Sequence, residues 1–132
     1  MRVLIVDDQP TMRRIVAKFV MKVGADECRE AADGRDALRI LAVTDVDLIV
    51  TDWNMPGMSG LDFIRAVRSN EATRTIPVLM LTTNDSREHV LAALKAGVTD
   101  FVVKPFKGEV LTDHLYALLY PDGGMRPVRP EP

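Results

Sequence analysis

Short apolar runs alternate five times with stretches of helical spacing, and this alternation constrains the fold more than any other feature of the sequence. Most of the runs are rich in aliphatic residues and too short for helices, which indicates strands buried on both faces. Strands that alternate with helices over short connections form a parallel sheet. We therefore predict an α/β fold, a doubly wound five-stranded parallel sheet of flavodoxin-like order 2-1-3-4-5 with helices on both faces. The strands are expected at Val3–Val6, Glu27–Ala31 (the weakest candidate), Val46–Val50, Ile76–Thr82 and Asp100–Val103.

Helix ends are indicated by capping and breaking residues. Proline opens a helix without cost, Ser or Asp followed by an acid three residues later has the spacing of a capping pair, and glycine ends a helix. These signals are Pro10 and Gly24, Ser59 and Asp62 before a helix to about Arg68, and Asp85 and Glu88 before Gly97. The apolar stripes expected to face the core are Met12, Ile15, Val16, Phe19, Val20 and Val23; Ala37, Leu38 and Leu41; Val90, Leu91 and Leu94; and Val110, Leu111, His114, Leu115 and Leu118.

The length of 132 residues fits one domain with a sizeable core. We place that domain at residues 1–119. The remainder, residues 120–132, holds four prolines and two glycines. A segment so polar and Pro-rich is expected to be a disordered tail.

The overall composition excludes several classes of function. Seventeen basic and nineteen acidic residues give a net charge of −2, without the basic excess of nucleic-acid or membrane-surface binders. The single cysteine, Cys28, excludes an internal disulfide, and we interpret it as a small apolar filler in a strand. No apolar run approaches membrane-spanning length and no signal-peptide pattern is present, so we expect a cytoplasmic protein.

Polar residues follow the strong strands at corresponding positions. Asp7 and Asp8 follow the first strand, Asp52 ends the third, Thr82 the fourth, and Lys104 follows the fifth. Ligand sites in open parallel sheets form at these carboxyl ends. In flavodoxin-like order the first and third strands are neighbours, so the three acids are expected to meet.

Three clustered carboxylates repel one another, and a hard cation with oxygen ligands removes the repulsion. Magnesium suits such a site because it retains waters and completes its shell with phosphate oxygens. Mg²⁺ and Lys104 together would balance the three carboxylates. An aspartate can accept a phosphoryl group, and we predict that Asp52 does so, with Mg²⁺, Lys104 and the Thr82 hydroxyl holding the group.

Each of these residues also has a simpler interpretation when it is taken alone. Asp7 and Asp8 are favourable at a positive helix end. Thr82 is ordinary at the end of a strand, Lys104 is a solvated charge, and Trp53 is partial core. Their coincidence at the strand ends favours a functional site.

Four segments resemble the response-regulator receiver domain, and in particular stand-alone CheY-like regulators. The segments are IVDDQPTMRRIV, VTDWNMPGMSGLDFIRAVR, PVLMLTTN and AGVTDFVVKPF. They agree with the family in order and spacing, and the resemblance covers residues 1 to about 119. It implies a regulator of a two-component system, such as a chemotaxis system, that takes a phosphoryl group from a histidine kinase or phosphotransfer protein.

The resemblance also implies a role for individual residues. Asp8, Asp52 and the main-chain carbonyl of Asn54 would bind Mg²⁺, with Asp7 close by or acting through water. Thr82 and Lys104 would contact the phosphoryl oxygens. Thr82 and Phe101 would form the switch, and the bond before Pro105 would be cis. Asn54 and Asn84 would flank the path of the hydrolytic water.

Output is expected through protein contact. The resemblance implies a monomer that binds a downstream effector with its fourth helix, fifth strand and fifth helix, including Val90, Phe101 and His114. Chemotaxis members often carry tyrosine where this chain has Phe101, so a contact that needs the hydroxyl is absent. The sequence shows no DNA-binding domain.

Two alternatives use some of the same residues. A phosphatase of the haloacid-dehalogenase kind needs a second aspartate two residues after the nucleophile, and this chain has Asn54 there. A pseudo-receiver that never turns over is disfavoured because every acceptor and metal residue is present. No phosphate-cradling glycine motif occurs. We expect no enzyme beyond a domain that catalyses its own phosphoryl transfer and autodephosphorylation.

Overall fold

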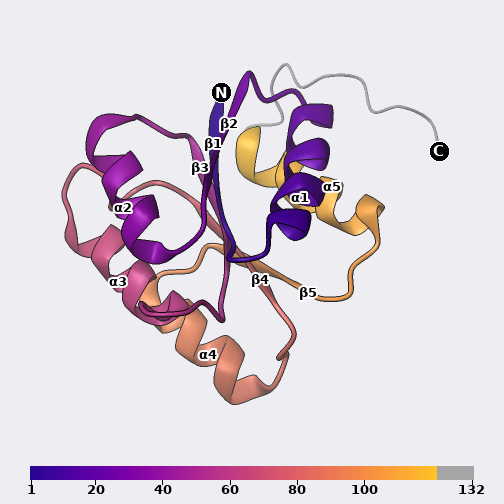
Figure 1. Cartoon of the computed structure of the whole chain (residues 1–132). Coiled ribbons are helices and arrows are strands. Elements are labelled where there is room, and N and C mark those ends of the chain that lie inside the picture. The colour runs from indigo at the N-terminus through magenta and orange to yellow at the C-terminus, as the bar shows by residue number, and fades with distance from the viewer. Residues whose placement is uncertain (122–132) are drawn as a thin grey trace.

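A computed structural model describes residues 1–121, in which five parallel strands form one sheet (Figure 1). The sheet order is β2-β1-β3-β4-β5, and every neighbouring pair is parallel. The predicted doubly wound fold and its strand order are therefore confirmed. The strands are β1 Arg2–Val6, β2 Glu27–Ala31, β3 Leu48–Asp52, β4 Val78–Thr82 and β5 Asp100–Val103.

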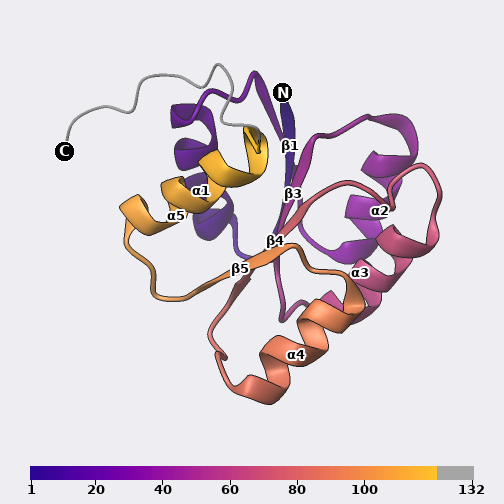
Figure 2. The same ribbon diagram turned by 180° about the vertical axis from the view of Figure 1, so that it is seen from behind.

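Helices cover both faces of this sheet, as the alternating pattern predicts. Helices α1 and α5 lie on one side, the α1/α5 face, and α2, α3 and α4 lie on the other, the α2–α4 face (Figures 1 and 2). Among the described residues, no helix is long and apolar enough to cross a membrane. The helices are α1 Pro10–Lys22, α2 Gly34–Val43, α3 Gly60–Ser69, α4 Arg87–Ala96 and α5 Gly108–Leu119.

Each face of the sheet has its own hydrophobic core, because successive side chains of a strand point to opposite faces. In β1, Val3 and Ile5 pack on the α1/α5 face, whereas Leu4 and Val6 pack on the α2–α4 face. This explains the continuous apolar runs of the central strands. The edge strand β2 buries fully only Ala31, which explains its weak pattern.

Cys28 lies in β2 and packs against the core of the α1/α5 face. Burial, together with the nearby charges of Glu30 and Glu27, raises the pKa of its thiol to about 11. The side chain is therefore a neutral thiol at neutral pH, in keeping with its interpretation as a filler.

Two strands begin later than predicted. β3 starts at Leu48 and continues through Asp52, because Asp52 still pairs with Leu81 of β4. β4 starts at Val78, and Pro77 before it has no N–H to donate, although its carbonyl accepts a hydrogen bond from Ile49. Asp52, the predicted phosphoryl acceptor, is therefore the last paired residue of β3 and does not lie beyond the strand.

The predicted boundary and apolar stripe of α4 are wrong. Ser86, not Asp85, caps the helix, with its hydroxyl accepting a hydrogen bond from the His89 backbone at 3.3 Å. Leu91 and Leu94 are 45% and 46% exposed, and Ala93 is the buried residue of this helix. The helix packs mainly against α3 near the edge of the sheet, which leaves most of its surface uncovered.

Two other helices also expose a residue assigned to a stripe. Ile15 of α1 and Val110 of α5 are exposed, while their neighbours Val16 and Leu111 are buried. The buried stripe of each helix is thus narrower than the apolar pattern suggests. His114 is partly exposed, and its Nδ1 contacts the Asp100 carboxylate.

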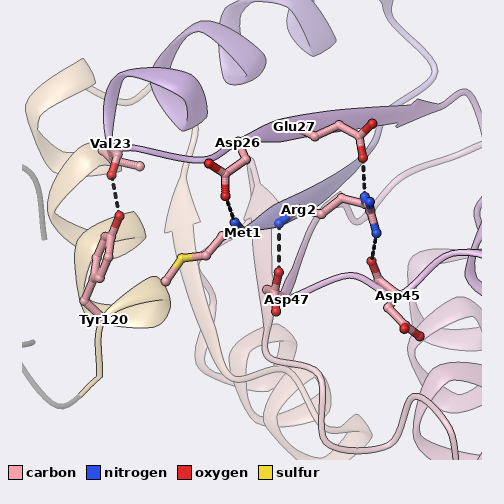
Figure 3. Close-up of polar contacts among 8 residues, drawn as sticks. All are labelled: Met1, Arg2, Val23, Asp26, Glu27, Asp45, Asp47 and Tyr120. Atoms are coloured by element: carbon pink, nitrogen blue, oxygen red, sulfur yellow. Dashed lines mark hydrogen bonds and ion pairs between the residues drawn. The ribbon is translucent and has the colours of Figure 1, made fainter. Parts of the chain in front are cut away.

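The amino ends of the strands are joined by polar contacts (Figure 3). The Arg2 guanidinium pairs with Glu27 and donates to the Asp45 carbonyl at 2.8 Å, while the Arg2 backbone N–H donates to Asp47. The terminal ammonium pairs with Asp26. Both cations drawn at this edge, the Arg2 guanidinium and the terminal ammonium, therefore have an acidic partner of their own.

Tyr120, which directly follows α5, also contributes to this edge. The Tyr120 hydroxyl donates a hydrogen bond to the Val23 carbonyl at 3.1 Å (Figure 3). Its ring also stacks at a tilt on Tyr116. Tyr120 is therefore packed, contrary to its assignment to the tail. Pro121 is the last described residue, and the rest of the expected tail, residues 122–132, lies outside the described part of the chain.

Replacement of Gly97 by alanine should destabilise the fold by about 2–3 kcal/mol, because two penalties combine. Gly97 caps α4 with a φ of +111°, where an L side chain is strained, and a Cβ there would lie 2.7 Å from Arg68 Cγ. Arg68 is fixed by hydrogen bonds to the carbonyls of Gly97 and Ile76. Urea unfolding measures the loss.

Gly57→Ala is the matched control for this prediction. Gly57 has a φ of +78° but open space around it, so only the strain of about 1 kcal/mol applies. Equal losses in the two variants would show that the Arg68 contact contributes nothing.

Candidate functional site

Three carboxylates meet where β1 and β3 end. Val6 pairs with Thr51, so Asp7 and Asp52 follow side by side at the carboxyl edge. One carboxylate oxygen from each of Asp7, Asp8 and Asp52 lies within 4.8 Å of the others. Asp7 is 3% exposed, Asp52 is half-buried, and Asp8 is exposed. The three acids thus lie together at the carboxyl ends of β1 and β3, as the strand order predicts.

Lys104 supplies the positive charge of the site. Its Nζ lies 3.3 Å from Asp52 Oδ1 and 3.7 Å from Asp7 Oδ2, and its side chain is about as exposed as that of Asp52. The backbone N–H of Lys104 donates to the Thr82 carbonyl at 2.7 Å, which ties the end of β5 to β4. The Lys104–Pro105 peptide bond is cis.

Negative charge is in excess at this edge. Burial raises the pKa of Asp7, and the charges of Asp52 and Asp8 raise it further; the hydrogen bond from the Gln9 N–H and the Lys104 charge act in the opposite direction. One ammonium therefore faces three carboxylates. An oxygen-only donor set with excess negative charge suits a hard divalent cation.

The loop after β3 folds back against its own start. The Gly60 N–H donates to the Trp53 carbonyl at 2.9 Å, and a Cβ at Gly60 would lie 2.5 Å from that oxygen. Only glycine permits this close approach. The loop encloses an open depression of about 430 Å³ lined by Asp8, Trp53, Asn54, Met55, Pro56 and Ser59. Asn54 thus lies beside the acid cluster.

Thr82, the last residue of β4, is 1% exposed, but its hydroxyl faces away from the acids. The hydroxyl oxygen accepts a hydrogen bond from the Asn84 N–H at 3.1 Å and lies 3.0 Å from His89 Nε2. Within the described residues it makes no hydrogen bond to Asp52 or Lys104. The structure therefore gathers Asp7, Asp8, Asp52 and Lys104, but not the Thr82 hydroxyl.

Sequence reasoning missed His89. Besides its contact with Thr82, its ring meets Trp53 edge-on, with ring centroids 4.7 Å apart. The signal was the spacing from Ser86 to His89, which is that of a cap and its third helical residue. Assigning the cap to Asp85 concealed it.

Phe101 lies in β5, opposite Met80 of β4, and is partly buried against the core of the α2–α4 face. It is separated from the acid cluster by β4. Val90 is half-buried on α4, so the residues predicted to form the output surface are partly accessible.

A family comparison matches residues 3–116 to the response regulator receiver domain. Curated relatives include the chemotaxis protein CheY of Pseudomonas aeruginosa, which is 46% identical over 87% of this chain and 93% of its own length. Chemotaxis protein CheY1 of Helicobacter pylori is 42% identical over 90% of this chain and 97% of its own.

Solved structures give the same result. CheY4 of Vibrio cholerae superposes with a TM-score of 0.83 at 39% identity, over 89% of this chain and 98% of that one. The receiver domain of a sensor histidine kinase from P. aeruginosa, which has a magnesium ion coordinated in its active-site cleft, gives a TM-score of 0.79 at 28% identity over 89% and 96%.

The chain belongs to the response regulator receiver family. Within that family it is a homologue of the CheY chemotaxis regulators, a phosphoacceptor response regulator of two-component signalling. Membership implies a signalling role that involves a histidine kinase and a downstream effector. Neither the phosphatase nor the pseudo-receiver alternative is favoured.

Asp7→Asn should stabilise the metal-free protein at neutral pH and the gain should vanish in acid. Because the folded-state pKa of Asp7 is raised above its usual value of 3.8, the folded protein holds this proton more tightly than the unfolded chain does. As the pH rises from about 3.8 towards the raised folded-state pKa, Asp7 therefore lowers the free energy of unfolding. Urea unfolding without metal, from about pH 3 to pH 7, measures the difference.

Asp62→Asn is the control, because Asp62 is an exposed carboxylate of α3 outside the cluster. A gain from Asp7→Asn that is the same at every pH would contradict the assigned cause, as would a loss at neutral pH.

Proposed function

We propose that Asp52 is the residue that accepts the phosphoryl group. The observation that carries this assignment is that Asp52 combines partial exposure with a Lys104 ammonium 3.3 Å away. Asp7 is closed to an incoming donor by burial, and one of its oxygens is occupied by the Gln9 N–H. Asp8 is exposed and has no cation contact in the described part of the chain. Asp52 is the acid that is both reachable and electrostatically supported.

Mg²⁺ is the cofactor that the donor set favours. Asp8, Asp52 and the Asn54 carbonyl would hold it, with Asp7 close by or acting through water. The magnesium ion in the P. aeruginosa receiver domain supports this choice. When bound, the metal would screen the repulsion between a carboxylate and an incoming anionic phosphoryl group.

The reaction itself is an in-line transfer. An Asp52 oxygen attacks phosphorus, the bond from phosphorus to the donor's histidine nitrogen breaks, and an acyl phosphate forms. Lys104 donates a charge-assisted hydrogen bond to a phosphoryl oxygen. Water later attacks the same phosphorus along a path flanked by Asn54 and Asn84. The bond from phosphorus to the Asp52 oxygen then breaks, inorganic phosphate leaves, and the carboxylate is restored. The domain thus catalyses its own phosphorylation and dephosphorylation and acts on no other substrate.

The response is a change of the α4, β5 and α5 surface. The Thr82 hydroxyl turns towards the phosphoryl group, and Phe101 moves into the space beside β4. An aromatic ring without a polar tip is easier to bury than tyrosine. The exposed Leu91 and Leu94 of α4 and Val110 of α5 supply apolar area for an effector protein. The monomeric state and the cytoplasmic location stay predictions.

Asp52→Asn should take up no phosphate above background from a phosphohistidine donor or from acetyl phosphate with Mg²⁺. The substitution keeps the shape of the side chain and removes the nucleophile. Acid-labile phosphate, measured with labelled donor, is the readout. Asp62→Asn should label like the wild type, since Asp62 lies outside the cluster. Label retained on Asp52→Asn would identify a different acceptor.

Mg²⁺ binding should change the emission of Trp53, which lines the depression beside Asp8. Asp8→Ala should weaken the apparent affinity at least about ten-fold, because a charged ligand is lost. Thr11→Ala, an exposed change in the first turn of α1, should leave it unaltered. Calorimetry provides a second readout. The magnesium site would be disproved by equal affinities of wild type and Asp8→Ala.

A further inference from the structure

His89 connects the ends of the two strands that carry the acceptor and the switch threonine. Its Nε2 lies 3.0 Å from Thr82 Oγ1 at the end of β4. Its ring packs edge-on against Trp53, the residue after Asp52, at an interplanar angle of 76°. Ser86 fixes the backbone of His89 in the first turn of α4. The imidazole is therefore contacted by Thr82 and Trp53, and Ser86 fixes the backbone that carries it.

Strand alternation puts Thr82 and Asp52 on opposite faces of the sheet. Thr82 continues the series of Val78 and Met80, which pack on the α2–α4 face. Asp52 continues the series of Leu48 and Val50, which pack on the α1/α5 face. The Thr82 hydroxyl must consequently turn away from α4 before it can reach a phosphoryl group on Asp52.

The hydroxyl is already engaged where it is. Its oxygen accepts the Asn84 N–H and lies 3.0 Å from His89 Nε2, and the hydroxyl is also within 3.4 Å of the Asn84 carbonyl as a donor. Rotation of the Thr82 side chain towards Asp52 moves Oγ1 away from Nε2, whichever ring nitrogen carries the proton. The contact with His89 is thus lost on switching in either tautomer.

We propose that His89 is a positioning residue that holds the Thr82 hydroxyl in its unphosphorylated orientation and competes with the phosphoryl group for it. The proposal rests on the proposed function of Asp52 and Thr82. His89 therefore makes switching less favourable. The free energy gained when Thr82 contacts the phosphoryl group is partly offset by the loss of its hydrogen bond with His89. His89 lies outside the four segments that resemble the receiver family.

Removal of the imidazole should strengthen the binding of a phosphoryl mimic. We would titrate beryllofluoride with Mg²⁺ into the wild type and into His89→Ala, following backbone amide shifts of β5 and α5. His89→Ala should bind about five-fold more tightly, which corresponds to the loss of one ordinary hydrogen bond from the unliganded state. His89→Gln, whose amide retains hydrogen-bonding groups at similar reach, should stay within about two-fold of the wild type. Glu88→Ala, an exposed change on the same turn, is the control for effects on α4 itself.

A double-mutant cycle separates this role from a merely structural one. In a Thr82→Ala background, His89→Ala should no longer change the affinity, because no hydroxyl remains to be held. The proposal is overturned if His89→Ala binds no more tightly than the wild type, or if its gain persists without the Thr82 hydroxyl. A wild type that binds no beryllofluoride would instead overturn the proposed function, and this inference with it.

Discussion

The functional site is governed by the electrostatic repulsion between acids at the carboxyl ends of β1 and β3. Three carboxylate oxygens lie within 4.8 Å of one another, and a single ammonium, that of Lys104, faces them. In the metal-free protein the charged form of Asp7 is disfavoured, first by burial and further by the neighbouring acids, as its raised pKa indicates. The same arrangement provides hard oxygen ligands for a cation and one accessible carboxylate beside a positive charge. The site is thus a region where stability is sacrificed for chemistry.

The two edges of the sheet differ in how their charges are balanced. At the amino ends, Arg2 and the terminal ammonium meet acidic partners, and the edge joins neighbouring strands (Figure 3). At the carboxyl ends, a single ammonium, that of Lys104, is shared by two of three clustered carboxylates. The two residues also point to different faces of the sheet: Asp52 to the α1/α5 face and Thr82 to the α2–α4 face. A change at Asp52 can therefore reach α4 through the rotation of one side chain that crosses the edge of the sheet.

Much of this was predictable from sequence, because the strand pattern is local and the topology follows from it. The convergence of Asp7, Asp8 and Asp52 required only the strand order and the carboxyl-end rule. The boundaries of β3 and β4 were not predictable. Pairing with Leu81 extends β3 to Asp52, and Pro77 delays the start of β4 to Val78. The exposure of Leu91 and Leu94 depends on where α4 packs, and the contact of His89 with Thr82 depends on which of two adjacent residues caps that helix. Such tertiary details are not encoded in apolar spacing.

We propose that Asp52, among three adjacent acids, carries the phosphoryl group. Borohydride reduces an acyl phosphate to an alcohol and so converts a phosphorylated aspartate to homoserine, which marks the acceptor permanently. The wild-type chain would be treated with acetyl phosphate and Mg²⁺, reduced, digested and analysed by mass spectrometry. Our account predicts homoserine at position 52 and unmodified aspartate at positions 7 and 8. Homoserine at position 7 or 8, or its absence from all three positions in a chain that has taken up phosphate, would contradict it.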